Sequence, residues 1–287
     1  MFSKVKLSLR AAQPEDRQKL ANLIHFEMFV HRHLDWRPAL DWIGHQPYLI
    51  AEEKSRIVAS LACPPDPPAV AWIRLFAVSA DIRVEDAWDA LWPEALERLS
   101  KFPASPYMAA IPMQRWFQMV LERAGFEQTH RVVMLSWEAF RGALTSNAPE
   151  VNIRPMNYDD LPEVEAVDVA AFPPVWQNSQ NSLALAYGQA AVATVLEEEG
   201  RIIGYQISTP TPMGGHLARL AVHPDYQGRG LGLALVNDLL SQFQRRGAQS
   251  VTVNTQQDNR VSLSLYEKVG FHRTGEEYPV YQFLSSK

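Results

Sequence analysis

The chain has 287 residues, of which 47% are hydrophobic and 21% are charged, and its formal net charge is -5. This length and apolar content suit two ordinary domains with buried cores and exclude a disordered chain. Proteins that bind nucleic acid by neutralising phosphates carry an excess of basic residues, whereas the net charge of this chain is negative. A small substrate such as an amine suits this balance better.

The single cysteine, Cys63, excludes an internal disulfide and a cysteine-built metal site, which fits a reducing cytoplasm. The N-terminal residues contain no apolar signal core, and no run of 18 apolar residues occurs anywhere in the chain. The sequence therefore predicts a cytoplasmic protein with no membrane segment, no bound metal and no nucleic-acid partner.

An internal repeat organises the chain. Three segments of the first half recur in the same order at an offset of 144 or 145 residues: 7–12 as 151–156, 75–78 as 219–222, and 121–126 as 266–271. Three such matches indicate one structural unit used twice. A polar, turn-rich stretch at 145–149 suits a linker, so we expect domains at 1–145 and 146–287.

Hydrophobic periodicity gives the elements of the second half. In chain order we expect a strand at 151–155, helical stretches at 158–171 and 179–188, a hairpin of 190–198 and 201–209, a strand at 217–222, a helix after 232, a strand at 250–255, a helix at 259–269, and closing strands at 271 and 278–283. The pattern predicts a mixed α/β (α+β) domain.

Residues 222–232 lie between a predicted strand and a predicted helix, where backbone N–H groups and the positive helix end can hold a phosphate. Glycines at 228, 230 and 232 let the backbone approach such a group closely. The spacing is not that of a P-loop, and a dinucleotide-binding motif would need its third glycine at position 233, which is Leu233.

The loop Gln227-Gly228-Arg229-Gly230-Leu231-Gly232 resembles the Q/R-x-x-G-x-G/A signature of the GCN5-related N-acetyltransferases (GNAT). Residues 259–271 resemble the Asn-x-x-(small)-x-x-Leu-Tyr-x-x-x-Gly-Phe segment of the same family. The resemblance covers the whole C-terminal half and implies two tandem GNAT folds, each with a central, mostly antiparallel sheet flanked by helices. It also implies acetyl-CoA as cosubstrate.

The resemblance further implies a V-shaped opening between the strand that ends at Val222 and the strand at 250–255, with the pantetheine arm of acetyl-CoA lying in it. One amide of the first strand would polarise the thioester carbonyl. The cofactor-binding residues implied are Leu220, Ala221, Val222, Gln227, Gly228, Arg229, Gly230, Leu231, Gly232 and Asn259.

Tyr266 stands where this family usually supplies the proton for the departing thiolate. The alternative for Tyr266 is a core aromatic, and the alternative for Asn259 is a helix N-cap. Many family members carry a glutamate as base three residues before the valine that ends the strand, but this chain has Arg219 there. His216 is the candidate base. The alternatives are that His216 is a surface histidine, or that water alone removes the proton from the substrate ammonium.

The first half lacks both parts of this site. Its loop at 79–88 has no glycine, Glu85 and Asp86 would repel a pyrophosphate, and Leu121 replaces Tyr266. We therefore expect a degenerate copy that packs against the active one. Seven of the eight tryptophans, all except Trp176, belong to this half, either as ordinary core or as part of an aromatic acceptor pocket.

The leading prediction is transfer of acetyl from acetyl-CoA to a primary amine of a small molecule in a ternary complex. The alternatives are acetylation of a protein N-terminus, as in the ribosomal-protein acetyltransferases, and a non-catalytic acyl-CoA sensor. Two copies in one chain are compatible with a monomer that is an internal pseudo-dimer, or with a homodimer.

Overall fold

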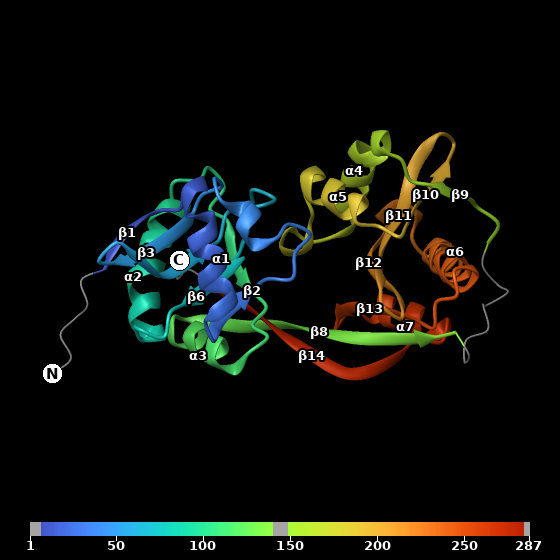
Figure 1. Cartoon of the computed structure of the whole chain (residues 1–287). Helices are drawn as coiled ribbons and strands as arrows, with labels where there is room; N and C mark the ends of the chain where they lie inside the picture. The colour runs from blue at the N-terminus through green and yellow to red at the C-terminus, as the bar shows by residue number, and fades with distance from the viewer. Residues whose placement is uncertain (1–6, 140–148, 284–287) are drawn as a thin grey trace. The chain divides into compact units, whose positions relative to one another are not determined.

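The computed structural model describes residues 7–139 and 149–283 (Figure 1). Contacts divide the chain into an N-terminal unit, formed by Met1–Thr129 with Pro279–Lys287, and a C-terminal unit, His130–Tyr278. The predicted boundary between residues 145 and 146, and most of the predicted linker, lie outside the described residues.

The N-terminal unit contains two sets of paired strands. Its elements in chain order are β1 (Ser8–Ala11), α1 (Arg17–Phe26), β2 (Phe29–Arg32), β3 (Tyr48–Glu53), β4 (Arg56–Ala62), β5 (Val70–Trp72), β6 (Leu75–Val78), α2 (Val84–Leu99), β7 (Tyr107–Ala110) and α3 (Arg115–Arg123). An antiparallel sheet has the order β1-β3-β4-β6-β2, and β5 pairs in parallel with β7. Phe76, Trp88 and Phe117 fill the core between them.

The C-terminal unit contains one mixed sheet in the order β8-β13-β12-β11-β10-β9. Its elements are β8 (Phe126–Glu138), β9 (Asn152–Pro155), α4 (Leu161–Ala171), α5 (Gln180–Gly188), β10 (Val192–Glu198), β11 (Arg201–Thr211), β12 (Gly214–Val222), α6 (Leu231–Arg245), β13 (Ser250–Gln256), α7 (Arg260–Lys268) and β14 (His272–Phe283). All neighbours in this order pair antiparallel except β12 and β13. The predicted elements are confirmed, except that the two closing strands form one strand, β14.

Helices cover both faces of this sheet (Figure 1). On one face, Val236 and Leu240 of α6 and Leu263 of α7 share a core with Val251 and Val253 of β13. On the other face α4 packs against β11 and β12. The predicted mixed α/β fold with helices flanking mostly antiparallel sheets is therefore confirmed.

The internal repeat is visible in side-chain contacts as well as in the order of elements. In each unit an arginine of the first strand binds an aspartate at the following helix start and a glutamate of the next strand. The two triads are Arg10 with Asp16 and Glu52, and Arg154 with Asp160 and Glu197. The hairpins β3–β4 and β10–β11 also carry a β-bulge at corresponding positions, Ala51/Glu52 and Leu196/Glu197.

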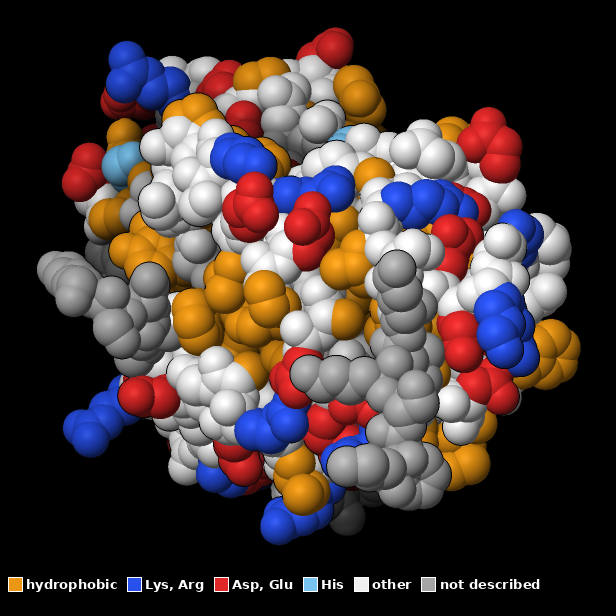
Figure 2. Space-filling view, turned by 90° about the vertical axis from the view of Figure 1, so that its left-hand side faces the viewer, with side chains coloured by type: hydrophobic (Ala, Val, Ile, Leu, Met, Phe, Trp, Pro, Cys, Tyr) orange, Lys and Arg blue, Asp and Glu red, His pale blue; other side chains and the backbone are white. Residues whose placement is uncertain are grey.

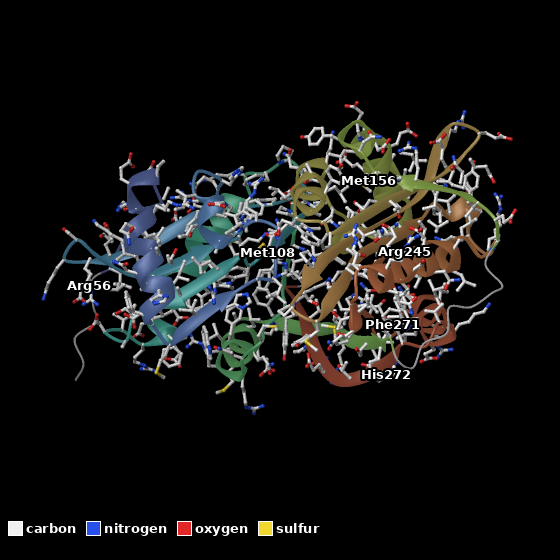
Figure 3. All side chains as sticks on the ribbon, turned by 45° about the vertical axis from the view of Figure 1, so that its right-hand side comes forward. Arg56, Met108, Met156, Arg245, Phe271 and His272 are labelled. Atoms are coloured by element: carbon white, nitrogen blue, oxygen red, sulfur yellow. The ribbon has the colours of Figure 1, made fainter. Side chains whose placement is uncertain are left out.

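Two strands carry the chain from one unit to the other. Residues 126–129 of β8 belong to the N-terminal unit and the rest of this strand to the C-terminal unit, whereas β14 passes between the units in the opposite direction. Figure 3 labels Phe271 and His272, where the chain leaves α7 and enters β14. The end of β14, from Tyr281 to Phe283, pairs with β7.

Charged side chains of both signs alternate over the face shown in Figure 2, and no broad basic area covers its described residues. Within the described parts of the chain, every helix is too short or too polar to cross a bilayer.

Candidate active site

A cavity of about 620 Å³ opens in the C-terminal unit where β12 and β13 part. The two strands pair in parallel only over residues 214–217 and 250–253. Beyond this point Leu220, Ala221 and Val222 of β12 and Gln256 of β13 line the cavity. The structure thus has the V-shaped opening expected between these strands.

The glycine loop forms one end of the cavity. Gln227, Gly228, Gly230, Leu231 and Gly232 all line it. Gly228 and Gly230 have φ angles of +76° and +79°, a left-handed conformation that glycine adopts without steric cost. Gly230 is also the N-cap of α6, so the first N–H groups of this 15-residue helix are directed toward the cavity end.

Arg229 is the member of the predicted loop set that does not line the cavity. Its guanidinium binds Glu198, the last residue of β10, at 3.1 Å from Nη1 to Oε2. Both side chains are exposed, and the arginine lowers the pKa of the Glu198 carboxyl. Arg229 therefore ties the loop to the neighbouring hairpin in this structure.

Asn259 is the N-cap of α7 and also borders the cavity. Its Oδ1 accepts a hydrogen bond from the Ser262 N–H at 3.1 Å, which makes it the N-cap of α7. The same residue lines the cavity. A capping side chain can thus border the ligand space, and contact of Asn259 with a cofactor stays a prediction.

Tyr266 is a buried residue of α7, 4% exposed, whose ring lies 5.6 Å from that of Phe271. Burial raises the pKa of its hydroxyl above the usual range, and the charge of Arg219 opposes this shift. The hydroxyl therefore keeps its proton at neutral pH. Tyr266 is not among the described residues that line the cavity, and its catalytic role stays a prediction.

His216 lies in the part of β12 that still pairs with β13, opposite Thr252. Its Nδ1 is 2.8 Å from the Thr252 hydroxyl. Burial lowers the pKa of the imidazole, and a hydrogen bond with Asn254 partly offsets this. His216 is outside the described cavity lining, so its assignment as the base also stays a prediction.

A buried ion pair lies beside the cavity. Asp168 of α4 is 0% exposed, and Arg219 Nε of β12 donates to its Oδ2 at 2.7 Å. The Tyr205 hydroxyl also donates to this oxygen, and the Asn178 N–H donates to Oδ1 at 2.8 Å. Three donors thus compensate a carboxylate from which solvent is excluded.

Arg219 connects this pair to an aromatic cavity wall. Its Nη2 donates to the Trp176 carbonyl at 2.6 Å, and its guanidinium carbon lies 3.5 Å from the centre of the Phe172 ring. Phe172 and Trp176 both line the cavity. Many family members carry at this position a glutamate that acts as the general base. Here Arg219 occupies it, and its cation holds the segment between α4 and α5.

Asp168, Phe172 and His130 were not predicted from the sequence as parts of this region. His130 lines the cavity, and its ring lies 6.0 Å from that of Trp176. The unusual Arg219 was a usable signal for Asp168, because a cation on a buried strand needs a counter-charge. No local pattern marks Phe172 or His130.

Comparison with known proteins agrees with this geometry. The sequence profile of the acetyltransferase (GNAT) family matches residues 161–271. The [ribosomal protein bS18]-alanine N-acetyltransferase of Escherichia coli K12 is 28% identical over 113 residues, which are 39% of this chain and 75% of that protein.

Two solved structures are similar over nearly the whole chain. A tandem GNAT protein from the clavulanic acid biosynthesis pathway has a TM-score of 0.61 at 15% identity and covers 98% of this chain and 100% of its own. A GCN5-related N-acetyltransferase from Kribbella flavida has a TM-score of 0.69 at 16% identity and covers 96% of this chain and 70% of its own. At these identities the likeness establishes the fold.

The family profile and the bacterial relative support the predicted class of enzyme, an acyltransferase. Residues 161–271, which lie within the C-terminal unit, thus match the GNAT acetyltransferase family.

Asp168→Asn tests the buried pair. The change leaves Arg219 without its counter-charge, and breaking a buried ion pair costs about 3–5 kcal/mol. We therefore expect the free energy of unfolding to fall by about that amount, measured by urea denaturation. The matched control is Asp159→Asn, which alters an exposed carboxylate nearby. Equal denaturation midpoints for the two variants would contradict the prediction.

Proposed function

We propose that the chain transfers the acetyl group of acetyl-CoA to a primary amine of a small molecule. The observation that carries this proposal is that the glycine loop at the start of α6 and one edge of β12 line the same cavity. The glycine loop suits a pyrophosphate because N–H groups and the helix dipole favour anions there. The edge of β12 suits the amide-containing pantetheine arm, because that arm can hydrogen-bond along a strand edge.

In the proposed reaction the chain's own groups have distinct tasks. Backbone amides of residues 220–222 bind the arm, and one of them stabilises the negative charge that develops on the thioester oxygen. Tyr266 gives a proton to the departing thiolate, for which its raised pKa is suitable because the hydroxyl stays protonated. For the base, the sequence offers His216 or, as the alternative, water.

The N-terminal unit, in this proposal, is a copy of the fold that has lost its CoA site. Its β6 corresponds in the repeat to residues 219–222, and the edge of β6 is paired with β2 from Phe29–Val78 to Arg32–Leu75. A strand of the chain thus occupies the edge that a pantetheine arm would need. Glu85 and Asp86 in the first turn of α2 add repulsion toward a pyrophosphate.

A second candidate function is acetylation of a protein N-terminus. The observation in its favour is the similarity to the E. coli ribosomal-protein alanine acetyltransferase. A cytoplasmic location, and a monomer or homodimer, remain part of the proposal.

The first test of this proposal is calorimetric titration with CoA, which should give one site per chain. Gly230→Val should abolish binding, because valine is strained at a φ of +79° and its Cβ would lie 3.2 Å from Pro149 Cδ. The control is Gly188→Val, at a position with open space around the added atom. A stoichiometry near two, or wild-type affinity in Gly230→Val, would be incompatible with the proposed site.

The acceptor class is tested by release of free CoA from acetyl-CoA. We compare a panel of small primary amines with a peptide that begins with alanine. The best amine should exceed the peptide in kcat/KM by roughly tenfold or more, since even one apolar contact is worth that much. A higher value for the peptide would favour the protein acetyltransferase instead.

Tyr266→Phe tests the proposed acid, because it removes the hydroxyl and keeps the ring that packs on Phe271. The value of kcat should fall by roughly tens to 10⁴-fold, the range for a general acid, while acetyl-CoA affinity stays unchanged. Thermal melting is recorded on the same sample. A variant that melts lower yet turns over at the wild-type rate would remove Tyr266 from the mechanism.

A further inference from the structure

His130 belongs to the first half of the sequence but to the C-terminal unit of the structure. It lies in β8, two residues before Val132, the first residue of that strand paired with β13. The Gln257 N–H donates to the Arg131 carbonyl at 2.8 Å, which holds this part of β8 beside the end of β13. The backbone therefore fixes His130 at the edge of the cavity.

Strand alternation directs the imidazole toward the aromatic wall. Val133, Leu135 and Trp137 pack into the core beneath α6 and α7. Residues of opposite parity face the other side of the sheet, and His130 is one of them. The contact with Trp176, at 6.0 Å between ring centres, confirms this direction. His130 thus lines the cavity on the side of α4.

The other ionisable side chains in this region are poorly suited to accept a proton. Asp258 and Lys268 line the same cavity. Asp258 is an exposed carboxylate, which is a weak base at neutral pH, and an ammonium group has no lone pair. Arg219 is a cation, and Asp168 beside it already accepts three hydrogen bonds.

We propose that His130 is the general base of the acetyl transfer, an inference that rests on the proposed function. Imidazole is the side chain that exchanges a proton most readily near neutral pH. One proton passes from the substrate ammonium to a ring nitrogen of His130. The free amine then bonds to the thioester carbon, the C–S bond breaks, and the amine nitrogen loses its second proton to solvent, from which Tyr266 recovers the proton that it gives to the thiolate. The thiolate takes up one proton, so that the products are an amide and the CoA thiol.

The test compares His130→Gln with the wild type over pH 6.5 to about 10, using an amine whose ammonium pKa is near 10. Without a base, the enzyme can use only substrate amine that is already deprotonated in solution. Below the ammonium pKa, the fraction of this free amine rises tenfold per pH unit. At pH 7 the variant should lose roughly 10²-fold in kcat/KM, and the loss should shrink steadily toward pH 10. A wall residue that only shapes the cavity gives the same loss at every pH.

Two further variants make the result decisive. His272→Gln changes a half-exposed histidine of β14 in the same unit and should keep the wild-type profile. His216→Gln examines the competing histidine. Wild-type kcat/KM in His130→Gln at pH 7, a loss independent of pH, or the shrinking loss in His216→Gln instead would each overturn the proposal. No amine-dependent CoA release by the wild type would refute the proposed function, and this inference with it.

Discussion

Parallel pairing between β12 and β13 stops after Leu217 and Val253, so that the next residues of β12 present one edge to the cavity. Their other edge still pairs with β11 up to Val222. Backbone N–H and C=O groups must find partners wherever water is excluded. The unpaired backbone groups of this open strand edge can therefore hydrogen-bond a ligand. The glycine loop that follows Val222 adds N–H groups that can bind an anion next to this edge.

The N-terminal unit meets the same constraint in another way. Its β5 pairs in parallel with β7, as β12 does with β13, and β6 then continues along β4. The edge of β6 is covered by β2 rather than left open. In our proposal one topology thus gives a binding cleft in one unit and a closed sheet in the other, depending on whether a short strand of the chain supplies the missing hydrogen bonds.

Sequence was informative where function depends on local backbone geometry. Gly228 and Gly230 were recognisable because left-handed turns before a helix require glycine, and Asn259 because a helix start favours it. Asp168 and His130 could not be found in this way. Asp168 meets Arg219 from 51 residues away, and His130 joins its unit only because β8 crosses from one unit to the other. Such partners are set by tertiary pairing and leave no periodic signal.

The crossing of β8 and β14 bears on how the chain acquires its structure during synthesis. The N-terminal unit includes residues from 279 onward, and its β7 pairs with Tyr281–Phe283. A ribosome has therefore made nearly the entire chain before this first unit receives its last strand. Until then the edge of β7 is open to other strands, which is a known route to aggregation. Cleavage between residues 140 and 148 would give two fragments that each lack a strand needed by its own sheet, rather than two independent domains.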